Sequence, residues 1–208
     1  KVKTYPVPLE WKDKGVQRYG FHGISHHYCA ERAAYFLKKE AAELKMSHTD
    51  LINHLIDTDL KRYGLDKNLH NTKKINQMAS RIKVGVLLGG ASNEREVSLE
   101  SGRNIVYKLS PQKYEAIPLF LDRDHTIYRI SHQLLVRNTT SEIAAGVKPE
   151  NRILWSELPL LLDFVFISLH GGIGENGAVQ GTLETLGLPY NGSSVFASAL
   201  CLDKYKTN

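Results

Sequence analysis

Two glycine-rich turns carry the side chains best suited to do chemistry in this chain. Glu94 follows two glycines in LLGGASNEREVSLESG, and His170 precedes two glycines in SLHGGIGENG. Each turn follows an apolar run, so both side chains are expected at the carboxyl end of a strand, where open α/β sheets place their ligands. A carboxylate fixed there can bind a substrate ammonium group. The alternatives are structural: Glu94 would complement the dipole of the helix that it begins, and His170 would hydrogen-bond only within the protein.

Several other kinds of site are not indicated. The first turn lacks the GK[ST] of a Walker A loop, and GxGxxG is absent, so we expect no nucleotide at this turn. Cys29 and Cys201 lie far apart, which argues against a disulfide framework or a zinc site and fits a reducing, cytoplasmic compartment. No apolar run approaches the ~20 residues of a membrane span. The start, KVKTYPVPLEW, has neither Met nor the apolar region of a signal peptide, so we interpret the chain as a fragment or a processed product.

In the larger, C-terminal part of the chain, strand and helix patterns alternate. Apolar runs predict strands near 82–88, 114–121, 164–169 and 188–190, and helical spacing predicts helices near 94–109, 177–186 and 194–202. The stretch 122–162 is less regular, with a short strand at 126–130 and peripheral helical pieces. This alternation is typical of a parallel sheet with right-handed crossovers. Because turns after parallel strands open at one edge of the sheet, we expect Glu94, Ser98 and His170 to meet in one pocket.

The first 80 residues differ in composition and pattern from the rest. Residues 1–41 hold an extended, proline-containing start, a strand pattern at RYGFHG and one helix pattern. Residues 42–80 are polar and are interpreted as a linker with one amphipathic helix, which begins after Ser47 and ends at Gly64. A piece of about 40 residues, such as the first of these, cannot bury a core of its own. We therefore expect the first 80 residues to form a poorly packed, α-rich N-terminal extension.

The excess of basic over acidic residues, 27 against 22, lies wholly in this extension. Residues 1–80 hold 14 Lys and Arg against 9 Asp and Glu, while the remainder of the chain is balanced. The lysines are scattered, with no run longer than two. This distribution is typical of a solvated surface, so we expect no nucleic-acid partner.

Three stretches in the correct order resemble the N-terminal domain of D-alanine–D-alanine ligase. They are VGVLLGGASNEREVSLESG, FISLHGGIGENGAVQGTLETLGLPYNGSSVFASAL and CLDKYKT, so the resemblance runs from about Ile82 to Asn208. It implies that residues 81–208 form a three-layer, Rossmann-like α/β domain with a parallel sheet, of the kind that precedes an ATP-grasp domain. It also implies the ATP- and Mg²⁺-dependent joining of two D-alanines for peptidoglycan precursors in the cytoplasm.

The resemblance also implies roles for individual residues. The glutamate matching Glu94 binds the ammonium of the first D-alanine, the serine matching Ser98 helps to orient it, and Val97 belongs to the same substrate site. The histidine matching His170 lies beside this substrate, and the lysine matching Lys204 approaches the ATP phosphates. D-alanine is therefore the expected ligand. Because the family dimerises largely through this domain, a second copy is the expected partner.

The part of that family that holds ATP and magnesium is not in this sequence. The family continues with ATP-grasp domains, which supply lysines for ATP, carboxylates for magnesium and the arginine that stabilises the tetrahedral intermediate. Making an acyl phosphate requires magnesium and positive charge at the γ-phosphate. We therefore expect these 208 residues alone to be inactive as a ligase.

A second resemblance concerns the extension. RYGFHGISHHYCAERAA, with YPVPLEW before it, resembles an internal stretch of acetate kinase over about residues 3–38. It implies that His22 stabilises a transferring phosphoryl group; His26 matches the second histidine of the motif, and Ile24 replaces its usual threonine. His22, His26 and His27 alone would suggest a metal site, but no further acidic or histidine ligand is evident, so we expect no metal.

Two alternatives to a ligase fragment stay open. The chain would be a fragment of acetate kinase, an acetate/ATP phosphotransferase, although the ligase resemblance covers about three times as many residues. Otherwise it would be a non-catalytic dimerisation module. The domain organisation that we favour is an acetate kinase-like fragment at 1–41, a linker with one helix at 42–80, and a ligase N-terminal domain at 81–208 without its ATP-grasp domain.

Overall fold

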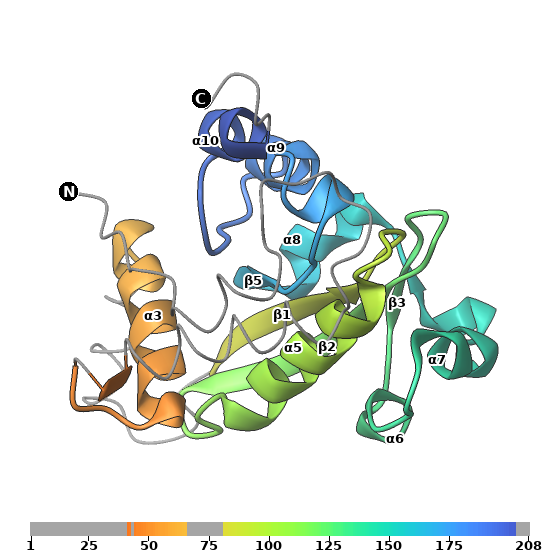
Figure 1. The fold of residues 1–208 in the computed structure, drawn as a ribbon, viewed down its shortest axis with the longest axis horizontal. Coiled ribbons are helices and arrows are strands. Elements are labelled where there is room, and N and C mark those ends of the chain that lie inside the picture. The colour runs from red at the N-terminus through yellow and green to blue at the C-terminus, as the bar shows by residue number, and fades with distance from the viewer. Residues whose placement is uncertain (1–40, 43, 66–80, 203–208) are drawn as a thin grey trace, which may run out of the picture.

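The computed structural model describes residues 41–42, 44–65 and 81–202, and these form one five-stranded sheet with helices on both faces (Figure 1). The strands are β1 (Ile82–Gly89), β2 (Tyr114–Leu121), β3 (Ile127–Arg129), β4 (Arg152–Ile153) and β5 (Phe164–Ile167). The α-helices are α3 (His48–Arg62), α5 (Arg95–Lys108), α6 (His132–Leu135), α7 (Thr140–Gly146), α8 (Leu158–Leu161), α9 (Ala178–Thr185) and α10 (Val195–Leu202). Short 3-10 helices are η2 (Pro149–Asn151), η3 (Trp155–Glu157) and η4 (Gly172–Gly174).

The sheet has the strand order β4-β3-β2-β1-β5 and is mixed. β1 lies between β2 and β5 and runs parallel to both, whereas β3 and β4 add an antiparallel edge beyond β2. The expected α/β fold with a parallel sheet is therefore confirmed at the centre, and the edge differs. The cause is the turn from Asp122 to Thr126, closed by a 2.9 Å bond from the Asp122 N–H to the Thr126 carbonyl. So short a connection joins antiparallel neighbours, because a parallel crossover needs a dozen or more residues.

Most predicted elements of this unit appear within two residues of their predicted bounds. The exception is the strand at 188–190, where only Tyr190 forms a single parallel bridge, to Val165. The irregular stretch 122–162 contains β3 and β4 as well as the short helices α6, α7 and α8. Local periodicity therefore located the regular elements, and the single bridge is too short to produce a periodic pattern.

β1 forms the centre of the hydrophobic core, and all of its residues except Lys83 are buried. Val84, Val86 and Leu88 join apolar side chains of α3, α5, α6 and α7 in one cluster. Leu87 joins a second cluster on the other face, with side chains of α8 and α9. Helices thus cover both faces of the sheet, which is the expected three-layer arrangement (Figure 1). A strand covered on both faces needs a continuous apolar run, and that run is visible in the sequence.

Helix α3 packs on this unit, which differs from the loose packing expected for the extension. Its Ile52, Ile56 and Leu60 are 6%, 0% and 0% exposed, and they belong to the cluster that contains β1 and α5. These three residues are spaced four apart, so they form one apolar face of the helix. The neighbouring Leu55 is 45% exposed. The helix is stable because this face is buried against the core of the α/β unit.

Directional hydrogen bonds also determine where α3 sits. Asn53 donates from Nδ2 to the Lys108 carbonyl (3.1 Å) and accepts from the Ser110 N–H (3.0 Å) at the end of α5. Asp57 accepts a hydrogen bond from the Tyr114 hydroxyl at the start of β2. The helix therefore has polar contacts with both neighbouring elements, and its position depends on more than apolar burial.

The ends of α3 are those that the sequence predicts. The Ser47 hydroxyl accepts the N–H of Asp50 at 3.1 Å, and Gly64 follows the last turn in the left-handed region, with φ 71°. Several other predictions lie outside the described residues: the RYGFHG strand, the first helix, His22, Ile24, His26, His27, Cys29, the linker at 66–80 and Lys204.

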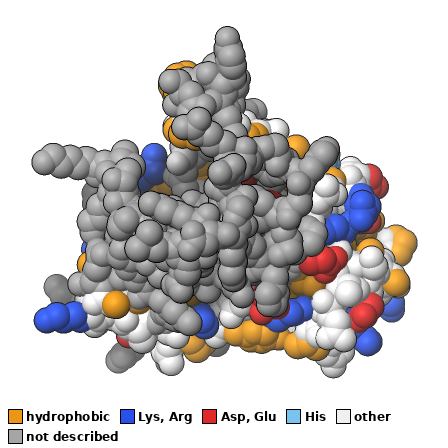
Figure 2. All heavy atoms as spheres, in the orientation of Figure 1, with side chains coloured by type: hydrophobic (Ala, Val, Ile, Leu, Met, Phe, Trp, Pro, Cys, Tyr) orange, Lys and Arg blue, Asp and Glu red, His pale blue; other side chains and the backbone are white. Residues whose placement is uncertain are grey.

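The surface of the described part is varied in chemistry. Figure 2 shows acidic, basic and apolar side chains interspersed over the described residues that face the viewer. Within the described ranges, no helix combines the length and the apolar character needed to cross a membrane. Cys201, in α10, is exposed and has a free thiol.

Candidate functional site

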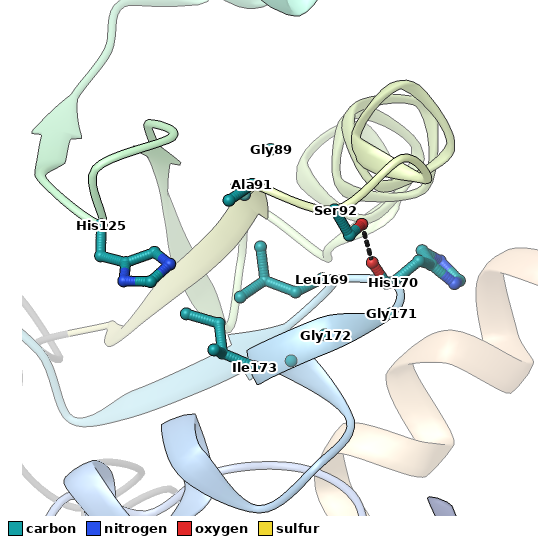
Figure 3. A pocket seen from close by; sticks show the side chains of 11 residues that line it. Gly89, Ala91, Ser92, His125, Leu169, His170, Gly171, Gly172 and Ile173 are labelled. Atoms are coloured by element: carbon teal, nitrogen blue, oxygen red, sulfur yellow. Dashed lines mark hydrogen bonds between the residues drawn. The ribbon is translucent and has the colours of Figure 1, made fainter.

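The turns after β1 and β5 meet at the carboxyl edge of the sheet (Figure 3). The pairing of these two strands extends to a 2.9 Å bond from the Ser168 N–H to the Leu87 carbonyl, so the turns start from adjacent positions. Gly171 has φ +69°, and a Cβ atom placed there would lie 3.3 Å from both Cβ and Oγ of Ser92. The two turns are therefore in contact, and their approach depends on a glycine at this position.

Ser98 lies beneath these turns and is fully buried in α5. Its Oγ accepts the Gly89 N–H and donates to the Ser168 carbonyl, both at 2.9 Å. A hydroxyl can donate and accept at once, so this one joins the end of β1 to the end of β5. Val97, the residue before it, is also buried, with 6% exposure. The structure thus places these two predicted substrate residues under the turns, where Ser98 holds main-chain groups.

Glu94 precedes the first turn of α5 and is half-buried. Its N–H donates to Ser92 Oγ at 3.1 Å, and that hydroxyl donates to the His170 carbonyl at 2.5 Å (Figure 3). Its carboxylate lies against the second turn, with Oε2 3.0 Å from the position of a Cβ atom at Gly171. The N-terminal end of a helix dipole favours a carboxylate at this place. Glu94 and the His170 turn therefore lie together at one edge of the sheet.

The His170 ring is approached by side chains from two other elements. Its Nε2 lies 3.0 Å from Ser101 Oγ in α5, and its Nδ1 lies 3.9 Å from Glu175 Oε1. The side chain is 29% exposed. Figure 3 shows the ring turned away from the side chains of Leu169 and Ile173. The imidazole is thus directed toward α5 and away from these two side chains.

A cavity of about 230 Å³ occupies that space. Glycines of both turns form much of its lining, and its larger residues are Leu169, Ile173, His125 and His170 (Figure 3). His125 comes from the turn between β2 and β3. Of the predicted site residues that the structure describes, only His170 contributes to the lining. The sheet edge therefore brings Glu94 and His170 close together without placing Glu94 and Ser98 in this cavity.

Arg95 anchors the start of α5 to the end of β2. It is buried, with 6% exposure; its Nη2 lies 3.7 Å from Asp122 Oδ1, and its guanidinium carbon lies 6.0 Å from the centre of the Phe120 ring. Burial, and next the neighbouring Arg123, lower the pKa of Arg95 from its ordinary value, while Asp122 acts in the opposite direction. This buried cation holds the helix whose N-terminal end carries the candidate carboxylate.

The sequence interpretation missed Ser101, which contacts the His170 ring. The available signal was spacing, since Ser101 lies three residues after Ser98 and residues three apart share a helix face. Across the ranges that the structure describes, no group of three His, Cys, Asp or Glu side chains is placed to hold a metal ion. The site therefore consists of a carboxylate, an imidazole and hydroxyls around two glycine turns.

The sheet and its two turns place the chain in the class of open α/β domains, which bind small ligands at the carboxyl edge of the sheet. Comparison with known proteins identifies the family within this class. Residues 83–193 match the family described as D-ala D-ala ligase N-terminus, and the chain belongs to this family. Residues 1–55 match the acetokinase family, so that second resemblance extends into α3.

Individual relatives agree with this assignment. A D-alanine–D-alanine ligase of Desulforudis audaxviator is 44% identical over 125 residues, which are 60% of this chain and 32% of that protein. The solved structure of a Coxiella burnetii D-alanine–D-alanine ligase is 32% identical with a TM-score of 0.52, and the Enterococcus faecalis VanG D-Ala:D-Ser ligase is 27% identical with a TM-score of 0.53. Each of these two matches covers 61% of this chain and 40% of the other. The chain spans about a third of the length of the curated relatives that it matches.

Proposed function

We propose that residues 81–208 are the D-alanine-binding part of an ATP-dependent D-alanine–D-alanine ligase, which joins two D-alanines for peptidoglycan precursors in the cytoplasm. The observation that carries this proposal is the position of Glu94. Its carboxylate lies at the N-terminal end of α5, against Gly171 and next to the His170 turn. A fixed negative charge at the carboxyl edge of a sheet suits the ammonium group of an amino acid.

The other site residues have supporting roles in this proposal. His170 lies beside the amino acid and limits its position, while Ser98 and Val97 support the Glu94 turn from below. Lys204 would approach the ATP phosphates, as the family resemblance implies. The described residues do not provide a magnesium ligand set, so we assign Mg²⁺ to none of them.

The experiment that tests the proposal measures D-alanine binding to the 208-residue chain by NMR titration. We expect D-alanine to shift the amide signals of both turns, and Glu94→Gln to weaken binding at least about tenfold, which is ~1.4 kcal/mol. The matched control is Glu100→Gln, because Glu100 lies on the same helix, is exposed and pairs with Arg103. No shift at the turns, or equal losses in both variants, would refute the assignment of Glu94.

A dimerisation module is the second function that an observation favours. A groove of about 750 Å³ runs along α9, and Leu154 beside it is 51% exposed. Leu160, in the nearby α8, is 83% exposed. A second copy of the chain is the partner that the family resemblance suggests, and burying these leucines would stabilise it.

The oligomeric state tests this second function. Sedimentation should show a dimer for the wild-type chain and a monomer for Leu160→Asp. The control is Val136→Asp, since Val136 is 58% exposed but lies next to α6, away from the groove. A wild-type monomer at all concentrations would exclude this partner. Sedimentation of the same three proteins with and without D-alanine shows whether D-alanine binding and dimerisation are independent.

A further inference from the structure

Three serines of one segment bind the turn after β5, and one of them differs from the others. Ser92 and Ser98 donate to main-chain carbonyls, those of His170 and Ser168. Ser101 instead meets a side chain, with its Oγ 3.0 Å from Nε2 of His170. The first two contacts position the backbone of the turn. The third acts on the orientation of the imidazole ring.

We propose that Ser101 is a positioning residue that holds His170 in one ring orientation and one tautomer, with the proton on Nδ1 and the Ser101 hydroxyl donating to Nε2. The part of this inference that concerns a ligand rests on the proposed function, because it takes the imidazole as a wall of the D-alanine site. The part that concerns the ring itself is independent of any ligand.

The surroundings of the two ring nitrogens determine the tautomer. Nδ1 faces Oε1 of Glu175 at 3.9 Å, and a carboxylate on that side favours a proton on Nδ1. Nε2 then has a lone pair and accepts from the hydroxyl of Ser101. Both partners favour the same tautomer, because Glu175 favours the proton on Nδ1 and the Ser101 hydroxyl stabilises a lone pair on Nε2. Ser101 in addition fixes the ring plane. A side chain held in this way is preorganised, so a ligand does not have to restrict its rotation on binding.

The position of Ser101 argues against a nucleophilic serine, although Ser101, His170 and Glu175 have the residue types of a catalytic triad. Ser101 lies in the interior of α5, where each main-chain N–H is bonded to the carbonyl four residues earlier. No helical N–H beside it is free to stabilise an oxyanion, and such donors supply much of the stabilisation in acyl transfer. The pair is therefore built to orient the histidine.

The test is ¹⁵N NMR of the histidine rings in the 208-residue chain, with the His170 signals identified by their loss in His170→Gln. We expect the Nδ1–H tautomer in the wild type and a mixture of both tautomers in Ser101→Ala. Ser101→Thr should restore the wild-type spectrum because it keeps the hydroxyl. Ser110→Ala is the control, since the Ser110 hydroxyl bonds to Gln112 beyond the far end of α5.

Each outcome has a defined meaning. A wild-type Nε2–H tautomer, or an unchanged spectrum in Ser101→Ala, overturns the inference, and so does covalent labelling of Ser101 by a fluorophosphonate. If Ser101→Ala does not fold, Glu175→Gln tests the same tautomer from the other ring nitrogen, because Glu175 is 45% exposed at its side chain and its loss should reduce the Nδ1–H share. An unchanged Nδ1–H share in that variant would also overturn the inference.

A D-alanine titration of the same samples separates the two proposals. We expect Ser101→Ala to weaken D-alanine binding about threefold, with rescue by Ser101→Thr. If the wild type does not bind D-alanine while the tautomer responds as expected, the proposed function fails and the ring-positioning role stands. If D-alanine binds and the tautomer is insensitive to Ser101, the ring-positioning role fails and the proposed function stands.

Discussion

At the scale of single residues, two hydroxyls and one glycine decide how the turn after β1 meets the turn after β5. Ser92 and Ser98 each donate one hydrogen bond and accept another, so each connects groups that come from different strands. Gly171 allows the Glu94 carboxylate to lie against the main chain of the second turn. These three residues have small side chains or none, which allows the main chains of the two turns to lie close together.

Replacement of Gly171 by Ala tests this close approach. The new Cβ would require an unfavourable φ and would meet Glu94 Oε2 at 3.0 Å, whereas Gly187 has a similar φ of +66° and nothing within 4 Å. We expect Gly187→Ala to lower the free energy of unfolding by ~1 kcal/mol and Gly171→Ala by ~2–3 kcal/mol. Urea unfolding measures both, and D-alanine binding should weaken only in Gly171→Ala. Equal losses would contradict the contact between Glu94 and Gly171.

At the scale of elements, the packing of α3 on the α/β unit is the least expected feature of the fold. It contributes buried apolar side chains to the core, and its Asn53 bonds to main-chain groups at the end of α5. The acetokinase-like match ends within this helix, at residue 55, so the buried Leu51 and Ile52 lie inside the match and the buried Ile56 and Leu60 lie beyond it. The helix therefore belongs structurally to the α/β unit.

Two neighbouring residues of α3 provide a matched pair for testing its packing. Ile56 is 0% exposed and Leu55 is 45% exposed. We expect Ile56→Ala to lower the free energy of unfolding by ~2–5 kcal/mol, since it leaves a cavity, and Leu55→Ala to change it by less than ~1 kcal/mol. Thermal or urea unfolding gives both values. Similar effects of the two substitutions would show that α3 is not docked as described.

The contact between α3 and β2 should make stability depend on alkaline pH. Burial, and then the hydrogen bond to Asp57, raise the pKa of Tyr114 above its ordinary value. An unfolded chain releases the phenol proton near pH ~10, before the folded protein does, so the stabilisation is complete below that pH and is lost as the pH rises further. Tyr114→Phe should therefore lose less stability than the wild type between about pH 9 and 11.

Equilibrium unfolding across this pH range measures that difference. Tyr107→Phe is the control because Tyr107 is 52% exposed on α5. If Tyr114→Phe and Tyr107→Phe follow the wild-type pH profile equally, the buried hydrogen bond to Asp57 does not contribute.

At the scale of the whole molecule, the chain combines matches to two families, and it spans about a third of the length of the curated ligases that it matches. The ligase-like unit has its own core and its own candidate site. The division into 1–41, 42–80 and 81–208 stays a proposal, with the qualification that α3 packs on the third part.

Catalysis by these 208 residues alone is expected to be absent. Neither D-alanyl-D-alanine nor acetyl phosphate should form with ATP and Mg²⁺, because both reactions need positive charge and metal at the γ-phosphate. Phosphate release is the measurement, with a ligase that contains an ATP-grasp domain as the positive control. Release above the no-protein level that depends on D-alanine or on acetate would contradict this expectation.

Limited proteolysis tests the proposed division of the chain. The first cuts should fall between Asp66 and Ser80, which the sequence pattern predicts to be a linker. The peptide that contains α3 should then remain bound to the α/β unit during gel filtration, because its apolar face is buried there. Dissociation of that peptide would show that its packing is weak, and resistance across the linker would argue against separate units.

The sequence by itself determined the regular elements of the α/β unit and the edge of the sheet at which the turns after β1 and β5 lie. Apolar runs and helical spacing are local properties, so β1, β5 and α5 could be predicted directly. Parallel strands place the turns that follow them at one edge, which brings Glu94 near His170. The family was also recognisable, because the long motifs around both turns occur in the correct order.

Only the tertiary structure decided which polar groups meet within that edge. Ser98 bonds to a carbonyl 70 residues away, and Ser101 reaches a ring 69 residues away. The docking of α3 likewise depends on contacts of Asn53 and Asp57 across more than 50 positions. Periodicity describes neighbours on one element, whereas these contacts depend on the distance and orientation of elements that the chain brings together only when it folds.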